Sequence, residues 1–145
     1  MRTWLYDRLT TDDQLTQILG GVEEVKDRVM PRRSRQVIPS QSPFIIYGLG
    51  NDTNEELGDS TANDVDTHRQ FFQVWIHDED SGSYSLIDDI IPVVKRLLVG
   101  ASSPENNIMT IAWLENSQEF NNETYNTLFR YMRFQAILGR TGAQQ

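Results

Sequence analysis

The length, composition and charge of the chain exclude several classes of protein. At 145 residues it has the size of one domain, which buries roughly 68–70% of its unfolded surface and needs no disulfide or metal for stability. It contains no cysteine, which excludes disulfides and cysteine nucleophiles and fits a reducing cytosol. The formal net charge of −8 argues against binding duplex DNA through its phosphates, because such binding depends on many lysine and arginine contacts.

The first predicted element is an amphipathic helix from about Thr3 to Leu19, which can break near Thr10. Thr11 and Gln14 have the spacing of a capping box, and Gly20-Gly21 ends the helix. The first residues lack the apolar region of a secretory signal, and no run is as long as a membrane span. We therefore expect a soluble, unprocessed chain.

Residues 21–43 predict a long connection, because three prolines interrupt the chain there. Arg32, Arg33 and Arg35 give this stretch a basic character. Long loops without secondary structure are uncommon in compact domains unless they bind something, so the three arginines are candidate partner contacts. The alternative is a solvated loop without a partner.

Phe44–Leu49 is a short apolar run between a proline and a glycine, which predicts a strand. Asn51–Asp66 follows as a long polar loop without apolar periodicity. Its acidic residues form a second set of candidate contacts with another chain: Asp52, Glu55, Glu56, Asp59, Asp64 and Asp66.

The central unit of the chain is predicted at residues 67–100. Thr67–His77 is rich in aromatic and β-branched residues and predicts a central strand, and Asp78–Gly82 predicts a turn. The next apolar residues recur at helical spacing: Leu86, Ile87, Ile90, Ile91, Val94, Leu97 and Leu98. Pro92 interrupts this helix and is expected to kink it or to delay its regular start.

Two more strands are predicted at Ile108–Leu114 and Thr127–Leu138, separated by a polar stretch. The order of elements is helix, strand, strand, helix, strand, strand. This order favours an α+β domain with a mostly antiparallel four-stranded sheet, whose N-terminal helix and second helix, between strands 2 and 3, pack on one face. We expect one domain over residues 1–140 and a polar C-terminal tail over residues 141–145.

No residue pattern predicts catalysis, a metal or a cofactor. Asp78–Gly82 resembles the start of a calcium loop, but glycine and serine occupy positions where a ligand and a glycine are expected. His68 and His77 are nine residues apart on one strand, hence on opposite faces. Asp88 and Asp89 are adjacent on a helix and cannot both act on one bond. We therefore expect a protein that is not an enzyme.

The predicted strands carry many large aromatic side chains. Most are expected in the core, and those that point outward would suit a subunit interface. The whole aromatic set of the predicted strands is Phe71, Phe72, Trp75, Trp113, Phe129, Tyr131 and Phe134.

The whole pattern resembles the tail terminator or tail completion proteins of long-tailed bacteriophages. The resemblance covers about Thr3 to Leu138 and rests on order and composition rather than on one motif. It is carried by the capped helix that ends in a glycine pair, by Pro43–Tyr47, by His68–His77, by the acidic-aliphatic helix and by Arg130–Gln135.

The resemblance implies a structural protein that forms a hexameric ring, caps the tail tube to fix its length, and docks to the head connector. It implies as partners other copies of the chain, the tail tube protein and the connector proteins, with DNA passing through the ring without specific binding. Its place would be the virion neck, after assembly in the host cytoplasm. The alternatives are another neck component, such as a head-completion or adaptor protein, and a small cytosolic enzyme or ligand-binding domain.

Overall fold

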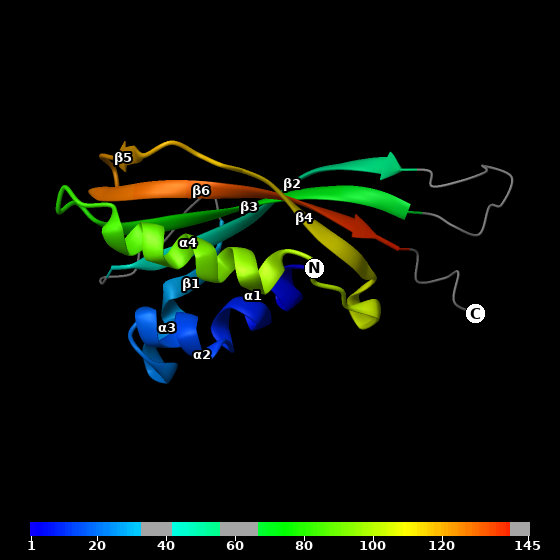
Figure 1. Cartoon of the computed structure of the whole chain (residues 1–145), viewed down its shortest axis with the longest axis horizontal. Helices are drawn as coiled ribbons and strands as arrows, with labels where there is room; N and C mark the ends of the chain where they lie inside the picture. Colours follow the sequence, from blue (N-terminus) through cyan, green and yellow to red (C-terminus); the bar gives the residue numbers. More distant parts are fainter. Residues whose placement is uncertain (33–41, 56–66, 140–145) are drawn as a thin grey trace, which may run out of the picture.

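A six-stranded, mostly antiparallel sheet organises the molecule (Figure 1). The computed structural model describes residues 1–32, 42–55 and 67–139. The strands run in the order β1-β2-β3-β6-β4, β5 also pairs with β6, and only the β1–β2 pairing is parallel among the described strands. Their bounds are β1 Val29–Pro31, β2 Phe44–Glu55, β3 Thr67–Glu79, β4 Ile108–Asn116, β5 Phe120–Asn122 and β6 Thr127–Leu138.

The helices pack on one face of the sheet, as the sequence predicts (Figure 1). They are α1 Arg2–Thr10, α2 Asp13–Ile18, α3 Val22–Arg28 and α4 Ser85–Leu98, with a short 3-10 turn at Pro104–Asn106. No helix within the described ranges is long and apolar enough to cross a membrane.

The core lies between these helices and alternate residues of the strands. Phe72, Val74 and Ile76 of β3 point toward the helices and are buried, because side chains alternate between the two faces of a strand. Phe134 of β6 stacks on Phe72 with ring centroids 5.1 Å apart. The helix α4 adds seven buried apolar residues, which explains why its apolar periodicity is so clear in the sequence.

The prediction of a helix that can break near Thr10 is confirmed, but its cap was assigned to the wrong residue. Asp12, not Thr11, caps α2, since the Leu15 backbone N–H donates to the Asp12 carboxylate at 3.0 Å. The Thr11 hydroxyl instead donates to the Asp7 carbonyl at 2.7 Å. Thr11 therefore ends the first helix instead of beginning the second.

The number of strands was predicted as four, and the two additional strands are the short ones. β1 and β5 have three residues each, too few for a period-two pattern. Residues 22–31 were predicted as part of a connection but form α3 and β1, and Val29 of β1 lies beside Ile45 of β2. α4 begins at Ser85 and continues through Pro92, so the proline does not delay its start.

The loop predicted from Asn51 begins later, because β2 continues to Glu55. Residues 52–55 pair with Thr67–Gln70 of β3 after a register shift that follows Leu49. Residues 52–55 form a strand despite their polar composition, because they pair with β3. We call residues 51–55 and 67–70 the hairpin arm, and Figure 1 shows it extending beyond the helices. The rest of the predicted acidic loop, residues 56–66, lies outside the described residues.

Candidate functional site

The face of the sheet opposite the helices, which we call the open face, carries both buried side chains, such as Ile46 and His77, and partly exposed ones, such as Phe71 and Trp75. Within the described ranges no layer of helices covers it (Figure 1). Its residues alternate with the buried ones along the long strands, because the pleat sends every second side chain to this side. They include Ile46, Gly48, Gly50, Phe71, Gln73, Trp75, His77, Phe129, Tyr131, Arg133 and Gln135.

One end of the open face is a stack of rings that crosses four strands. His77 of β3 lies between Phe44 of β2 and Phe129 of β6, with ring centroids 4.7 and 5.1 Å away. Phe120 of β5 continues the stack 5.1 Å beyond Phe129. Stacking of this kind stabilises the packing of the four rings against one another.

His77 is a packing residue rather than a proton-transfer group. Its Nδ1 atom lies 2.9 Å from the Thr127 hydroxyl, and both side chains are buried. Burial lowers the pKa of His77 to about 4, because the charged imidazolium loses its hydration there. The ring is therefore neutral near pH 7.

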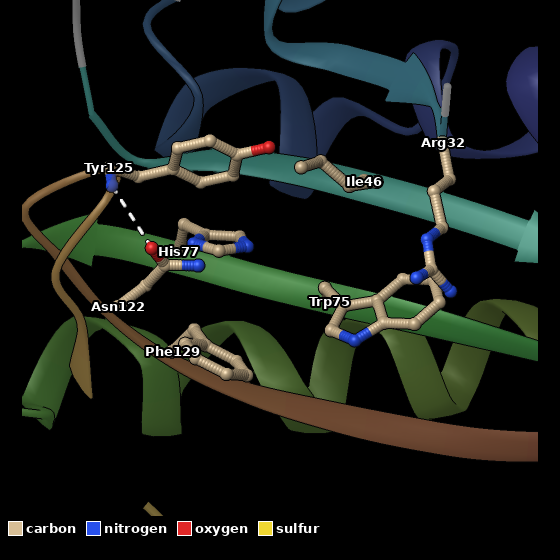
Figure 2. A pocket seen from close by; sticks show the side chains of 7 residues that line it. All are labelled: Arg32, Ile46, Trp75, His77, Asn122, Tyr125 and Phe129. Carbon is tan, nitrogen blue, oxygen red and sulfur yellow. Dashed lines mark hydrogen bonds between the residues drawn. The ribbon is translucent and has the colours of Figure 1, made fainter. Parts of the chain in front are cut away.

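A hollow of about 180 Å³ lies beside this stack. Figure 2 shows the seven side chains that line it: Arg32, Ile46, Trp75, His77, Asn122, Tyr125 and Phe129. The Tyr125 backbone N–H donates to the Asn122 side-chain oxygen at 3.0 Å, which fixes one wall. The lining is mostly aromatic with an arginine at one end.

A second hollow, of about 360 Å³, continues along β2 and β3 from the same arginine and tryptophan. Gly48 and Gly50 leave its floor without side chains, and a Cβ atom at Gly48 would lie only 3.2 Å from the Trp75 ring. Glycine inside a strand commonly marks a close approach of another group. We call the two hollows together the open-face groove; its rim and floor include Arg32, Gly48, Gly50, Phe71, Trp75 and Arg133.

Arginines give the open-face groove positive charge in an otherwise acidic protein. The Arg32 guanidinium carbon lies 5.1 Å from the centroid of the Trp75 ring, a cation–π geometry. In the part of the chain that the structure describes, no carboxylate pairs with Arg32. Arg133 is 3.1 Å from Glu115 in an exposed ion pair of low stabilising value. The groove therefore offers at least one guanidinium for a carboxylate.

The structure places three of the nine predicted contact residues. Arg32 is exposed and lies on the rim of the groove. Asp52 and Glu55 belong to the hairpin arm, four and seven residues beyond Gly48 along β2. The remaining six, Arg33, Arg35, Glu56, Asp59, Asp64 and Asp66, lie outside the described residues. Within one subunit Arg32 and the two placed acids are thus not brought together.

Sequence reasoning did not connect Trp75 and the two glycines with a groove. Trp75 was included only in a group of outward aromatic candidates, and Gly48 was treated as part of an apolar run. The sequence contained a signal, because Phe71, Gln73 and Trp75 alternate with the buried residues of β3. Gly48 lies inside the predicted strand Phe44–Leu49, and Gly50 follows its end. Which arginine covers the tryptophan depends on β1, which the sequence did not predict.

Across residues 1–32, 42–55 and 67–139, no group of three His, Asp or Glu side chains is placed to hold a metal ion. His68 and His77 lie on opposite faces of β3, as predicted, since the ladder with β6 is continuous between them. Asp88 forms an ion pair with Arg130 at 3.0 Å, and Asp89 is exposed on the helix.

A sheet with helices on one face and a grooved open face defines the class of fold, and comparison with known proteins shows where that fold recurs. No protein-family model matches the sequence, and no curated protein matches it. Among solved structures, the chain is similar to one in the "Virion of native gene transfer agent (GTA) particle", with a TM-score of 0.65 and 16% identity, covering 94% of this chain and 92% of that chain. A second solved chain, with 11% identity over 90% of this chain and 93% of its own, has a TM-score of 0.46 and carries no argument. The first likeness shows that the two chains share a fold along nearly their whole length.

Proposed function

We propose that the protein is a structural component of a phage-like virion that caps the tail tube, ends tail polymerisation and joins the tail to the head connector as a hexameric ring, without catalytic activity. The observation that carries this proposal is the fold shared, over nearly the full length of both chains, with a chain of a virion particle. The resemblance of the sequence to tail terminator proteins supports that role within this setting.

The open face supports a role in assembly. A half-exposed aromatic surface with an arginine on its rim has the composition of a protein interface, where aromatic residues and arginine are enriched. A closed ring of identical subunits needs two different patches, one meeting the other on the next copy. We propose that two oppositely charged segments of the sequence supply these patches: one carries Arg32, Arg33 and Arg35, and the other carries the six acids of residues 51–66.

The proposed partners are other copies of the chain, the tail tube protein and the head connector proteins, at the neck of a virion assembled in the host cytoplasm. DNA would pass through the ring without specific binding, because the acidic protein repels the phosphate backbone.

Native mass spectrometry and electron microscopy with tail tubes test the proposal. We expect hexamers, and density of one ring at one end of each tube. Replacing Arg32, Arg33 and Arg35 by Ala is expected to weaken ring formation or tail joining while the subunit remains folded. The double variant Arg2→Ala, Lys26→Ala is the control, because it removes exposed positive charge on the helical side.

A protein that remains monomeric and does not bind the tail tube would contradict the proposed function. Binding to the portal side instead of the tube end would assign the protein to head completion. Unchanged ring formation and tail joining in the triple arginine variant would remove the arginines from the contact.

A further inference from the structure

We infer that an exposed patch at the free edge of the sheet binds the acidic end of a second copy of the chain, so that subunits associate head to tail. This inference rests on the proposed function and gives its ring a subunit contact made by described residues. The edge patch is formed by Val99, Met109, Trp113 and Leu114, with Lys95 beside them. The acidic end is formed by Asp80, Tyr84, Glu119 and Phe120.

The first observation is a gathering of exposed apolar side chains at β4. Of the five large apolar residues that are exposed in the described part of the chain, four belong to the edge patch. Met109, Trp113 and Leu114 of β4 have relative exposures of 50, 38 and 39%. Val99, at 43%, lies beside them, because the N–H of the next residue, Gly100, donates to the Ile111 carbonyl of β4 at 2.8 Å. Apolar residues grouped in this way on a surface mark an interaction site.

The second observation is the position of β4 in the sheet. It pairs with β6 on one side, and none of the described strands pairs with its other side. An edge strand with exposed apolar side chains favours association with another chain. The register of β4 shifts next to Met109 and next to Leu114, which interrupts its regular ladder. We therefore expect side-chain contacts, rather than a continued ladder, to hold the partner.

The third observation is positive charge next to these apolar residues. The Lys95 ammonium lies 3.9 Å from the centroid of the Trp113 ring, a cation–π contact that positions the charge at the patch. Arg8 is exposed near the same end of α4, where its Nε atom donates to the Leu97 carbonyl at 3.0 Å. No carboxylate of the described residues pairs with Lys95 or Arg8. A two-fold contact centred on the patch would bring these cations together, so the patch favours an acidic partner surface.

The fourth observation is the surface at the start of α4, which carries the opposite charge. The Tyr84 hydroxyl donates to the Phe120 carbonyl at 2.9 Å, and the Asn121 side chain donates to the Asp80 carboxylate at 3.2 Å. Burial raises the pKa of Tyr84, and the negative charges of Glu119 and Asp80 raise it further. Both acids are exposed, and within the described ranges neither forms an ion pair. The acidic end thus combines partly exposed aromatic rings with two carboxylates that lack a cation.

The two surfaces are similar in composition and opposite in charge. Each has an aromatic side chain at its centre, Trp113 in the edge patch and Phe120 in the acidic end, as interfaces commonly do. They lie at opposite ends of α4, whose 14 residues span about 21 Å, so neither covers the other within one subunit (Figure 1). A contact between two different patches is heterologous, and repeated around an axis it closes a ring.

Charge reversal at one residue of each surface tests the contact in the full-length chain. Lys95→Glu reverses the edge patch, and Glu119→Lys reverses the acidic end. Each change alone is expected to raise the dissociation constant for self-association at least ten-fold, measured by analytical ultracentrifugation. The control is Glu23→Lys combined with Lys26→Glu, at exposed positions of α3, which is expected to associate like the wild type.

The double variant Lys95→Glu, Glu119→Lys exchanges the two charges, so the ion pair between copies forms again with its polarity reversed. We expect its dissociation constant to return to within about three-fold of the wild-type value. Such a recovery is independent of folding, because the double variant contains both changes. A double variant that associates as weakly as the single variants would overturn the inference. Single variants that associate like the wild type, or a wild type that does not self-associate, would overturn it as well.

Leu114→Ser tests the apolar part of the edge patch. It is expected to weaken self-association at least ten-fold, because an exposed apolar side chain that becomes buried in the contact is removed. Val22→Ser changes the one exposed large apolar residue of the described chain that lies outside the patch, and it should have no effect. Wild-type association by Leu114→Ser would remove the patch from the contact.

Electron microscopy with tail tubes separates this inference from the proposed function. Rings at tube ends that both single charge reversals leave unchanged would retain the proposed function and overturn the inference. Association that depends on Lys95 and Glu119 but yields neither rings nor binding to tubes would support the contact and contradict the proposed function.

Discussion

At the scale of single residues, His77 shows how a titratable side chain is used as a packing element. It lies in a ring stack between Phe44 and Phe129, and its Nδ1 atom contacts the buried hydroxyl of Thr127. Because burial lowers its pKa to about 4, it is uncharged when the protein is folded near neutral pH. In the unfolded chain the same ring has a pKa near its ordinary value of about 6.5.

This difference predicts a stability that depends on pH. At pH 7.5 and above the ring is almost entirely neutral in both states, so His77 adds little pH dependence there. Below pH 6.5 the unfolded chain binds a proton that the folded chain does not, so the free energy of unfolding falls as the pH drops toward 4. We expect a loss of about 2 kcal/mol between pH 7.5 and pH 5, measured by urea unfolding.

The variant His77→Phe keeps a ring in the stack and removes the titration. It is expected to lose about 1 kcal/mol at pH 7.5, because the Thr127 hydroxyl loses its partner, and to show a much smaller drop at pH 5. His68→Gln is the control and should keep the drop. An unchanged pH dependence in His77→Phe would mean that other groups cause it.

At the scale of elements, α4 and the long strands were predicted, and the short strands β1 and β5 were not. Its seven buried apolar residues repeat over four turns, and such a pattern is visible without knowledge of the rest of the fold. β3 and β6 were found because long runs of aromatic and β-branched residues favour strands. The predicted Thr127–Leu138 has the bounds of β6 in the structure.

The elements that were missed depend on contacts from outside their own sequence. β1 exists because β2 lies beside it, and residues 52–55 form a strand because β3 pairs with them. The groove depends on Arg32, which follows β1 directly, so the sequence could not place it over Trp75. Of the residues that line the groove, the sequence analysis named Arg32 as a candidate contact, and it missed the floor formed by Gly48 and Gly50.

Pro92 gives a prediction at this scale. It lies on the exposed side of α4, inside a regular helix, where its ring removes one backbone hydrogen bond and crowds the Asp88 carbonyl. Replacing it by Ala is expected to raise the free energy of unfolding by about 1–3 kcal/mol, less than the full helix preference because alanine also makes the unfolded chain more flexible.

Urea unfolding at pH 7.5 measures this change. Asp89→Ala, at another exposed position of the same helix, is the matched control and should shift the free energy by no more than about 0.5 kcal/mol. A Pro92→Ala variant less stable than the wild type would show that α4 needs the proline, for example to keep a bend that fits the sheet.

At the scale of the whole molecule, charge is divided between the sequence segments. The segment of residues 51–66 holds most of the net negative charge, and the groove holds an arginine without a carboxylate partner among the described residues. The net charge of −8 also disfavours binding to DNA, because an acidic protein repels the phosphate backbone.

We therefore expect no saturable binding to duplex DNA at 150 mM salt, measured by fluorescence anisotropy with a labelled 30-base-pair duplex. A variant with Asn or Gln in place of the six acids of residues 51–66 has a net charge of −2, because six negative charges are removed from −8. Its binding shows whether these acids are responsible for the repulsion. Tight binding by the wild type, with a steep dependence on salt, would contradict the expected passage of DNA without specific contacts.

The order of strands also decides how the chain must fold. β3 and β6 are neighbours in the sheet, yet the residues that pair between them are far apart in sequence, from Glu79 with Thr127 to His68 with Leu138. Between them the chain must first place α4, β4 and β5. Contacts of this range make folding slow, on the order of milliseconds to seconds, because loop closure precedes the gain from pairing. The walls of the groove come from β2, β3 and β6, so the groove can form only after that closure. A newly made subunit therefore lacks the groove until its sheet is complete.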